Sequence, residues 1–283
     1  RRVLPEATVF ISDPSWENHR ALFEYAGFKV NTYPYYDAVS RSVDFEAMMT
    51  GIGMLPAGSI IVLHACCHNP TGADLDAQQW HQVIELVADR HLVPFIDMAY
   101  QGFADGIRED ARVLEWFAAS GLQFLVASSF SKSFSLYGER VGALSIVTAD
   151  GDETARVLSQ VKRVVRTNYS NPPTHGGAIV AAILANPELR ALWENELGDM
   201  RERIRTMRSG LAEKLKGLGV AQDVSFITRQ RGMFSYTGLS AAQVDRLRDD
   251  HGIYAVSSGR ICVAALNSRN LDQVASAIAL VSV

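Results

Sequence analysis

The 283-residue sequence has few cysteines, no excess of basic residues and no long apolar run. Its three cysteines, Cys66, Cys67 and Cys262, are odd in number and two are adjacent, which favours a reducing compartment and a cytoplasmic protein. A membrane-spanning helix needs roughly 18–20 apolar residues, so we expect no membrane span. The net charge of −4 argues against nucleic acid or an anionic membrane surface as a partner.

Internal repeats and low-complexity segments are also absent. The composition is 48% hydrophobic and 20% charged, as is ordinary for a globular protein. The length fits one large domain, or a large domain with a smaller one.

In the first half of the chain, short apolar runs alternate with segments whose apolar residues recur at the spacing of a helix. Three runs are typical of buried strands by length and β-branching, and two segments between them favour helices. The expected strands are 59–67, 92–100 and 124–130, and the expected helices are 76–90 and 109–119. This order predicts an α/β fold with a mostly parallel sheet flanked by helices.

The pattern changes near Asn186. Asn186 and Pro187 are typical of a helix start, and one face then stays apolar for about thirty residues. Two short strands (234–238 and 261–266), a capping box at 240–243 and a final helix from about Asn270 follow. We therefore expect a large domain over 1–185. Over 186–283 we expect a long interdomain helix and a small α+β C-terminal domain.

Polar side chains follow the three expected strands. The strands lead into CCHNPTG (66–72), DMAY (97–100) and SSFSK (128–132). Ligands of parallel sheets bind beyond the carboxyl ends of the strands, so these segments are expected to share one crevice. That crevice would hold an amide, a carboxylate, a phenol, a hydroxyl, an amine and a guanidinium, from Asn69, Asp97, Tyr100, Ser129, Lys132 and Arg140.

Lys132 is the residue whose chemistry is most specific. A lysine with its ordinary pKa of about 10.4 is a poor nucleophile at neutral pH. Partial burial and the nearby Arg140 would lower that pKa, as a Schiff-base lysine requires. Hydroxyls with Arg140 suit a phosphate, and Asp97 suits a cationic ring nitrogen. Together these groups indicate pyridoxal 5'-phosphate (PLP).

A metal site is the alternative in the first of these segments. His64, Cys66 and His68 would lie on one face of their strand. Residues so near to one another on a single strand cannot easily surround one metal ion, and no fourth ligand is evident. We therefore expect no metal.

The chain resembles the aspartate and aromatic amino acid aminotransferases, which are PLP enzymes of fold type I. The similarity runs along the whole sequence. SFSLYGERVG and RGMFSYTGLSAAQVDRLR are most similar to the bacterial aromatic (tyrosine) enzymes, whereas NYSNPP is similar to the aspartate enzymes. The matching motifs are DPSWENH (13–19), CCHNPTGADL (66–75), DMAYQGF (97–103), SSFSKSFSLYGERVG (128–142), VRTNYSNPP (165–173) and SSGRICVA (257–264).

The resemblance implies roles for the residues around the cofactor ring. Lys132 would form the Schiff base and, once displaced by substrate, move the proton between the substrate Cα and the cofactor. Asp97 would pair with the pyridine nitrogen, with His19 behind it. Tyr100 and Asn69 would bond the oxygen of the ring's 3-hydroxyl group.

The resemblance also implies roles at the phosphate and the substrate. Ser129 and Arg140 would hold the phosphate, and Trp16 would stack on the ring. Arg260 would bind the substrate α-carboxylate in a bidentate manner. Arg166 would reach into the active site of a partner subunit, so a homodimer is expected. Trp16 and Asn69 would border the substrate with these two arginines.

The expected function is therefore a PLP-dependent aminotransferase of amino acid metabolism. It would move the amino group between aromatic or dicarboxylic L-amino acids and 2-oxoglutarate. A PLP-dependent lyase or decarboxylase of the same fold is one alternative, and a non-catalytic aminotransferase-like domain is another. The pair Arg166 and Arg260 favours exchange between amino and 2-oxo acids, and the complete set of catalytic residue types favours an enzyme.

Members of the resembled family are longer, and they begin roughly 100 residues earlier. That part would carry the N-terminal arm, half of the small domain, a glycine-containing phosphate loop and a tyrosine that reaches the neighbouring subunit. If the polypeptide starts at Arg1, we expect weak PLP binding and little activity.

Overall fold

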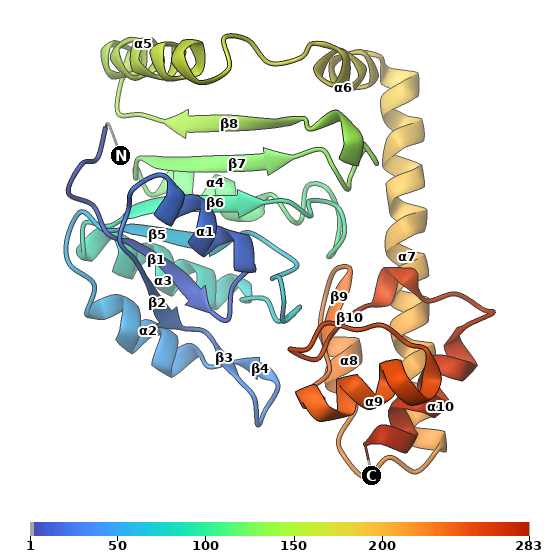
Figure 1. Cartoon of the computed structure of the whole chain (residues 1–283). Helices are drawn as coiled ribbons and strands as arrows, with labels where there is room; N and C mark the ends of the chain where they lie inside the picture. Colours follow the sequence, from blue (N-terminus) through green and yellow to red (C-terminus); the bar gives the residue numbers. More distant parts are fainter. Residues whose placement is uncertain (1–2, 283) are drawn as a thin grey trace.

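The structure, a computed structural model, describes residues 3–282 and is built on a six-stranded sheet (Figure 1). The strand order is β2-β1-β5-β6-β7-β8, in which β8 alone runs antiparallel to its neighbour. The predicted α/β class with a mostly parallel sheet is confirmed. The strands are β1 (Val9–Asp13), β2 (Val30–Pro34), β5 (Ile60–His64), β6 (Val93–Met98), β7 (Phe124–Ser129) and β8 (Gly142–Val147).

Each predicted strand ends earlier than its apolar run. The strand β5 stops at His64, and Cys67 then adopts a φ of 52°, a left-handed conformation that cannot continue a strand. The strands β6 and β7 end at Met98 and Ser129. The functional motifs therefore lie in loops just past the sheet, rather than on the strands themselves.

Helices cover both faces of the sheet. Helices α2 (Phe45–Gly53), α3 (Ala77–Asp89) and α4 (Arg112–Ala119) pack on one face, and α1 (Glu17–Tyr25) packs on the other. Helix α3 begins at a capping box formed by Asp76 and Gln79. The predicted apolar stripe of this helix is confirmed, because Trp80, Val83, Ile84 and Val87 are all buried.

The strands β3 (Tyr36–Asp37) and β4 (Ser42–Val43) and the helices α5 (Gly151–Asn168) and α6 (His175–Ala185) lie outside the face-covering layers. The two short strands form a hairpin beyond β2. The two helices lie beyond the edge strand β8 (Figure 1). No residue of α5 is buried.

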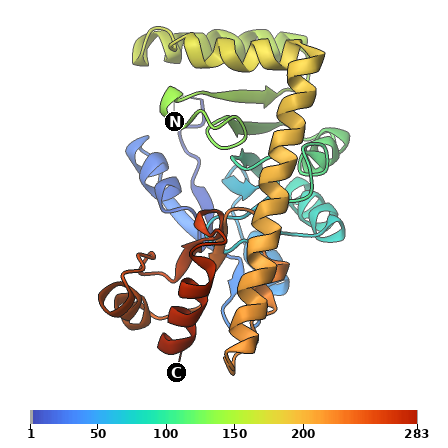
Figure 2. The ribbon, with the colours of Figure 1, turned by 90° about the vertical axis from the view of Figure 1, so that its right-hand side faces the viewer.

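The long helix predicted after Asn186 is confirmed as α7 (Pro187–Gly217). The Asn186 side chain accepts hydrogen bonds from the backbone N–H groups of Glu188 and Leu189, which fixes the start of the helix. Figure 2 shows α7 running the height of the molecule, from α6 to the C-terminal elements.

The C-terminal elements pack around the lower end of α7. The predicted capping box at Ser240 and Gln243 is confirmed at the start of α9. The predicted strand 261–266 is wrong at both ends: β10 covers only Arg260–Cys262, and Val263–Ala265 form a 3₁₀ turn. The elements are α8 (Phe226–Arg229), β9 (Phe234–Tyr236), α9 (Ala241–His251), β10 (Arg260–Cys262) and α10 (Leu271–Val281).

One apolar cluster joins the sheet to these C-terminal elements. It contains Cys67, Tyr100 and Phe103 from the strand-end loops, and Leu197 and Ile204 from α7. The cluster holds the loops beside the β9–β10 pair, so side chains from distant parts of the chain meet there. Within residues 3–282, every helix is too short or too polar to cross a membrane.

Candidate active site

Three neighbouring strands bring the polar segments of the sequence to one edge of the sheet. The strands β5, β6 and β7 are parallel, with His64 opposite Asp97 and Asp97 opposite Ala127 in register. The loop after β5 carries Asn69, and the turn after β7 carries Lys132. The end of β6 therefore lies between the other two segments.

Asp97 accepts a hydrogen bond from His19, which comes from α1. The distance from His19 Nε2 to Asp97 Oδ2 is 2.9 Å. Burial opposes ionisation of Asp97, but the hydrogen bond from His19 and the nearby Lys132 charge lower its pKa below the ordinary value. Asp97 is thus a carboxylate at neutral pH. His19 Nδ1 lies 2.9 Å from Ser15 Oγ, which fixes the orientation of the imidazole ring.

Tyr100 and Lys132 lie side by side in front of this pair. Lys132 Nζ is 4.7 Å from the centre of the Tyr100 ring. Burial lowers the pKa of Lys132, and the Arg140 charge lowers it further, against the opposing effect of Asp97. Burial and the Asp97 charge raise the pKa of the Tyr100 phenol, so it stays protonated. The site therefore pairs an amine whose pKa is lowered with a phenol whose pKa is raised.

Asn69 connects the sheet to the C-terminal elements. Its Nδ2 donates to Tyr100 Oη at 3.3 Å, and its Oδ1 accepts from Arg260 Nη1 at 2.8 Å. The Arg260 guanidinium also lies over the Phe234 ring, 4.6 Å from its centre. Gly259 has a φ of 82°, and a Cβ there would lie 2.7 Å from the Leu239 carbonyl oxygen, so the approach to Arg260 requires glycine.

The remaining predicted residues are nearer to the surface. Trp16 is 37% exposed, and its ring meets the His19 ring edge-on at 5.2 Å. Ser129 Oγ accepts from the Ser131 backbone N–H. Arg140 follows the 3₁₀ turn η1 (Tyr137–Glu139), is exposed and donates to the Tyr137 carbonyl.

Arg166 is not brought to the cluster. It is exposed in the last turn of α5, beyond β8, and its guanidinium binds the Ser170 hydroxyl. The predicted role of Arg166 in a partner's site stays a prediction.

Sequence reasoning missed a buried layer behind the site. His68 Nε2 lies 2.9 Å from Ser12 Oγ, its Nδ1 lies 2.8 Å from Thr71 Oγ1, and its ring stacks on Tyr35 at 4.0 Å. Burial lowers the pKa of His68 to about 3, so its ring is neutral. Burial also lowers the pKa of His64. Their only signal in the sequence is the pair of histidines four residues apart in HACCH (64–68), which also suits the metal site considered above.

Asp74 is a second missed residue. Its carboxylate accepts from the backbone N–H groups of Cys67 (2.7 Å) and His68 (2.8 Å), which closes the loop that presents Asn69. Burial raises the pKa of Asp74 to about 6, against these two hydrogen bonds. Its only signal in the sequence is an aspartate three positions after the Asn69-Pro70-Thr71 turn.

The donor set fits PLP. A lysine with a lowered pKa suits covalent attachment of an aldehyde, and a buried carboxylate suits a protonated ring nitrogen. A protonated phenol and an amide N–H suit a ring oxygen. These groups, from Lys132, Asp97, Tyr100 and Asn69, converge within one cluster.

Comparison with known proteins gives a consistent result. The family model "Aminotransferase class I and II" matches residues 2–278. The chain is 64% identical to an aspartate aminotransferase of Pseudomonas aeruginosa, over 98% of this chain and 70% of that protein. It is 52% identical to an aromatic-amino-acid aminotransferase of Escherichia coli, over 99% of this chain and 71% of that protein.

A solved structure is also similar over the same length. It is the aromatic-amino-acid aminotransferase of Burkholderia pseudomallei, covalently bound to pyridoxal phosphate. The TM-score is 0.98 at 66% identity, and the match covers 99% of this chain and 70% of that chain. The chain thus spans about 70% of the length of the relatives it matches.

Proposed function

Because the chain belongs to the class I and II aminotransferase family, we propose that Lys132 is its catalytic lysine and that Asp97 and Tyr100 act with it. The protein is a PLP-dependent aminotransferase that moves the amino group between aromatic or dicarboxylic L-amino acids and 2-oxoglutarate. One observation carries the assignment of roles: Asn69 contacts both the phenol beside Lys132 and the guanidinium of Arg260.

Lys132 and Asp97 perform the proton chemistry. PLP supplies, when bound, an electron-accepting ring that stabilises the negative charge left on the substrate Cα. Lys132 takes the proton from that Cα, and its lowered pKa favours the unprotonated amine that this step needs. The Asp97 carboxylate holds a proton on the ring nitrogen, and the His19 hydrogen bond keeps Asp97 ionised and fixed in direction.

Other residues bind and orient the two ligands. Tyr100 and Asn69 would bond the ring oxygen of bound PLP, Trp16 would stack on its ring, and Ser129 and Arg140 would bind its phosphate.

Arg260 binds the substrate α-carboxylate through two parallel N–H donors. Its contact with Asn69 Oδ1 holds the guanidinium in the site before substrate arrives, which reduces the entropy lost on binding.

The assembly and organisation are part of this proposal. We propose a cytoplasmic homodimer in which Arg166 binds the distal group of the substrate in the partner's site. Its exposure on the outer helix α5 supports a role outside its own site. Residues 1–185 form the cofactor-binding domain, and 186–283 form the long helix and the small domain.

The test is a half-reaction followed by the absorbance of the cofactor. Glutamate added to the PLP-loaded protein should convert the aldehyde form to the amine form, and 2-oxoglutarate should reverse the change. The Lys132→Ala variant should lose the Schiff-base absorbance. Lys216→Ala, at an exposed position of α7, is the matched control and should keep it. Release of carbon dioxide from the amino acid would instead identify a decarboxylase.

A further inference from the structure

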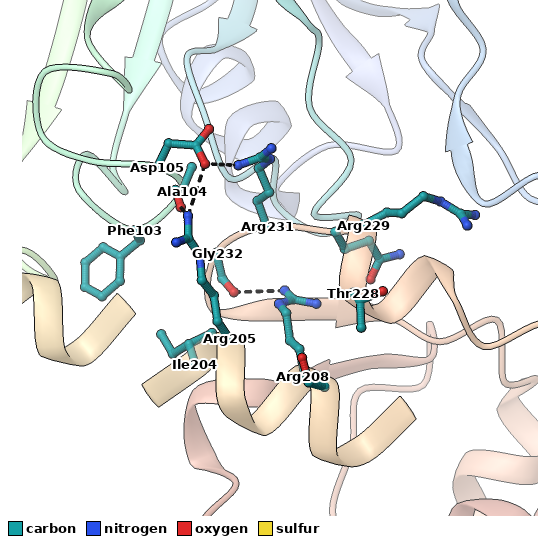
Figure 3. A pocket seen from close by; sticks show the side chains of 12 residues that line it. Phe103, Ala104, Asp105, Ile204, Arg205, Arg208, Thr228, Arg229, Arg231 and Gly232 are labelled. Atoms are coloured by element: carbon teal, nitrogen blue, oxygen red, sulfur yellow. Dashed lines mark hydrogen bonds and ion pairs between the residues drawn. The ribbon is translucent and has the colours of Figure 1, made fainter. Parts of the chain in front are cut away.

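Three segments of the chain enclose a cavity of about 570 Å³ (Figure 3). This cavity lies apart from the candidate active site. These segments are the loop 103–105 after β6, the middle of α7 and the stretch 228–232 that leads from α8 to β9. Lys132, Asp97 and Arg260 do not line the cavity. Its volume falls within the range of small-molecule sites, about 300–1,000 Å³.

The lining of this cavity is strongly basic. Four arginines line it, Arg205, Arg208, Arg229 and Arg231, against one carboxylate, Asp105. Outside the lining, Glu202 pairs with Arg205 and Asp223 pairs with Arg229, so four positive and three negative charges leave a formal surplus of one. We call this cavity the arginine pocket. Its surplus contrasts with the net charge of −4 on the whole chain.

Arg208 is the buried member of the set. Its side chain is 3% exposed, and its two terminal nitrogens donate to the carbonyls of Ile227, Gly232 and Phe234. Its Nε has no hydrogen-bond partner, and within residues 3–282 no carboxylate lies within ion-pair distance of it. Burial lowers its pKa to about 10, so it is still a cation at neutral pH. A buried charge without a counter-charge is costly, and a bound anion would offset that cost.

Arg205 and Arg231 are half-exposed and share Asp105 as a counter-charge, and Arg205 also pairs with Glu202. Arg205 Nη2 lies 3.1 Å from Asp105 Oδ1, and Arg231 binds the same oxygen. Figure 3 shows both side chains directed to Asp105, Arg205 from α7 and Arg231 from the stretch that leads to β9. A guanidinium has five N–H donors, so each side chain keeps donors for another acceptor. Two guanidinium groups close together in the pocket lining suit a ligand that has more than one anionic group.

We propose that the arginine pocket binds a small organic anion that carries two or more carboxylate or phosphate groups. The pocket joins parts of the chain that also support the active site. The Arg231 backbone N–H donates to the Gly72 carbonyl at 2.7 Å, in the loop that carries Asn69. An anion held by the arginines of α7 and of the stretch 228–232 stabilises the contact of the sheet with the C-terminal elements. The inference does not depend on the proposed function, because it concerns binding alone.

Isothermal titration calorimetry on the PLP-loaded full chain tests the proposal. Citrate and fructose 1,6-bisphosphate represent the carboxylate and the phosphate source of the anion, and sodium chloride at matched ionic strength controls for general screening. We expect saturable binding of one or both, and the stronger of the two identifies the chemical class. Arg231→Gln and Arg205→Gln should each weaken that binding about tenfold, the effect of losing one charge-assisted hydrogen bond.

Two control variants separate the pocket from other sites. Arg246→Gln, on the exposed face of α9, removes a positive charge elsewhere and should leave binding unchanged. Arg260→Gln should also leave it unchanged. An equal loss in Arg260→Gln would assign the binding to the active site and overturn the proposal. Absence of saturable heat with both ligands, or unchanged affinity in Arg231→Gln and Arg205→Gln, would overturn it too.

Discussion

The candidate active site has two halves that are held in different ways. The inner half consists of Asp97, His19, Tyr100, Asn69, Lys132 and Arg260. The outer half consists of Trp16, Ser129, Arg140 and Arg166. Inner contacts join distant parts of the chain: His19 and Asp97 are 78 residues apart, and Asn69 and Arg260 are 191 apart.

Outer contacts, by contrast, stay within a few residues. Arg140 binds the carbonyl of Tyr137, three positions before it, and Arg166 binds Ser170, four positions after it. The inner half is therefore positioned by the tertiary fold before any ligand binds. Trp16, Arg140 and Arg166 are held by contacts with residues close in sequence, so their geometry depends on what they bind, whereas Ser129 is fixed at the end of β7 opposite Gly142. Substitutions in the inner half should therefore reduce the activity the most.

The largest effect is expected for Asp97→Asn. An amide cannot hold the positive charge on the ring nitrogen, so kcat should fall about 10³-fold. Steady-state kinetics with glutamate and 2-oxoglutarate measure the change. Asp89→Asn, at the exposed end of α3, is the matched control and should keep full activity. A loss of less than threefold in Asp97→Asn would remove Asp97 from the catalytic set.

A smaller loss, concentrated in substrate binding, is expected for Arg260→Gln. Losing a bidentate contact with a carboxylate should raise KM for the amino acid about 100-fold. Asn69→Ala should raise KM less, because Arg260 keeps its charge and its contact with Phe234. If Asn69 positions Arg260, the double variant should show a coupling free energy of about 1 kcal/mol. Strictly additive effects would mean that the two residues act independently.

The inner half was also the more predictable half. Asn69, Asp97 and Lys132 follow three apolar runs, and the parallel order of those runs places their ends together. The sequence offered no comparable signal for the antiparallel β8 or the hairpin of β3 and β4. These elements depend on tertiary contacts, such as the 2.8 Å hydrogen bond from Arg41 to Gln222, 181 residues away.

The layer behind the site escaped prediction for the same reason. His68 and Ser12 are 56 residues apart, and nothing in either local sequence indicates the pair. The arginine pocket is assembled from three segments between residues 103 and 232. Residue types at strand ends can be read from the sequence, whereas the partners that hold them depend on packing.

The buried histidines predict a pH effect on stability. His68 has a pKa of about 3 in the folded chain, below its ordinary 6.5, and burial lowers the pKa of His64 as well. The unfolded chain thus binds more protons below pH 6.5. The free energy of unfolding should fall by about 1.4 kcal/mol per pH unit for each such histidine as pH drops from 6.5.

Urea unfolding at pH 7.5, 6 and 5 measures this slope. His68→Gln keeps groups that can bond Ser12 and Thr71 but does not titrate, so it should flatten the slope. His175→Gln, at an exposed position, should leave the slope unchanged. An identical slope in His68→Gln and the parent protein would show that His68 does not control the acid response.

The smallest effect is expected in the outer half, for Arg140→Gln. Arg140 is exposed and bonded only to its own turn, so its contribution to phosphate binding is about 1 kcal/mol. The affinity for PLP should fall about fivefold. The free energy of unfolding of the cofactor-free protein should change by less than about 0.5 kcal/mol. Equilibrium dialysis and urea unfolding measure the two quantities.

A second signature of Arg140→Gln reports on Lys132. The Arg140 charge adds to burial in lowering the pKa of Lys132, so its removal should raise that pKa. The lysine would then lose its proton at a higher pH, and the alkaline shift should appear in the pH dependence of PLP attachment. The same shift in Arg166→Gln would mean that a general change in charge, and not the position of Arg140, tunes the lysine. An unshifted pH profile in Arg140→Gln would mean that burial alone lowers the pKa of Lys132. The outer half of the site would then have no electrostatic influence on the inner half.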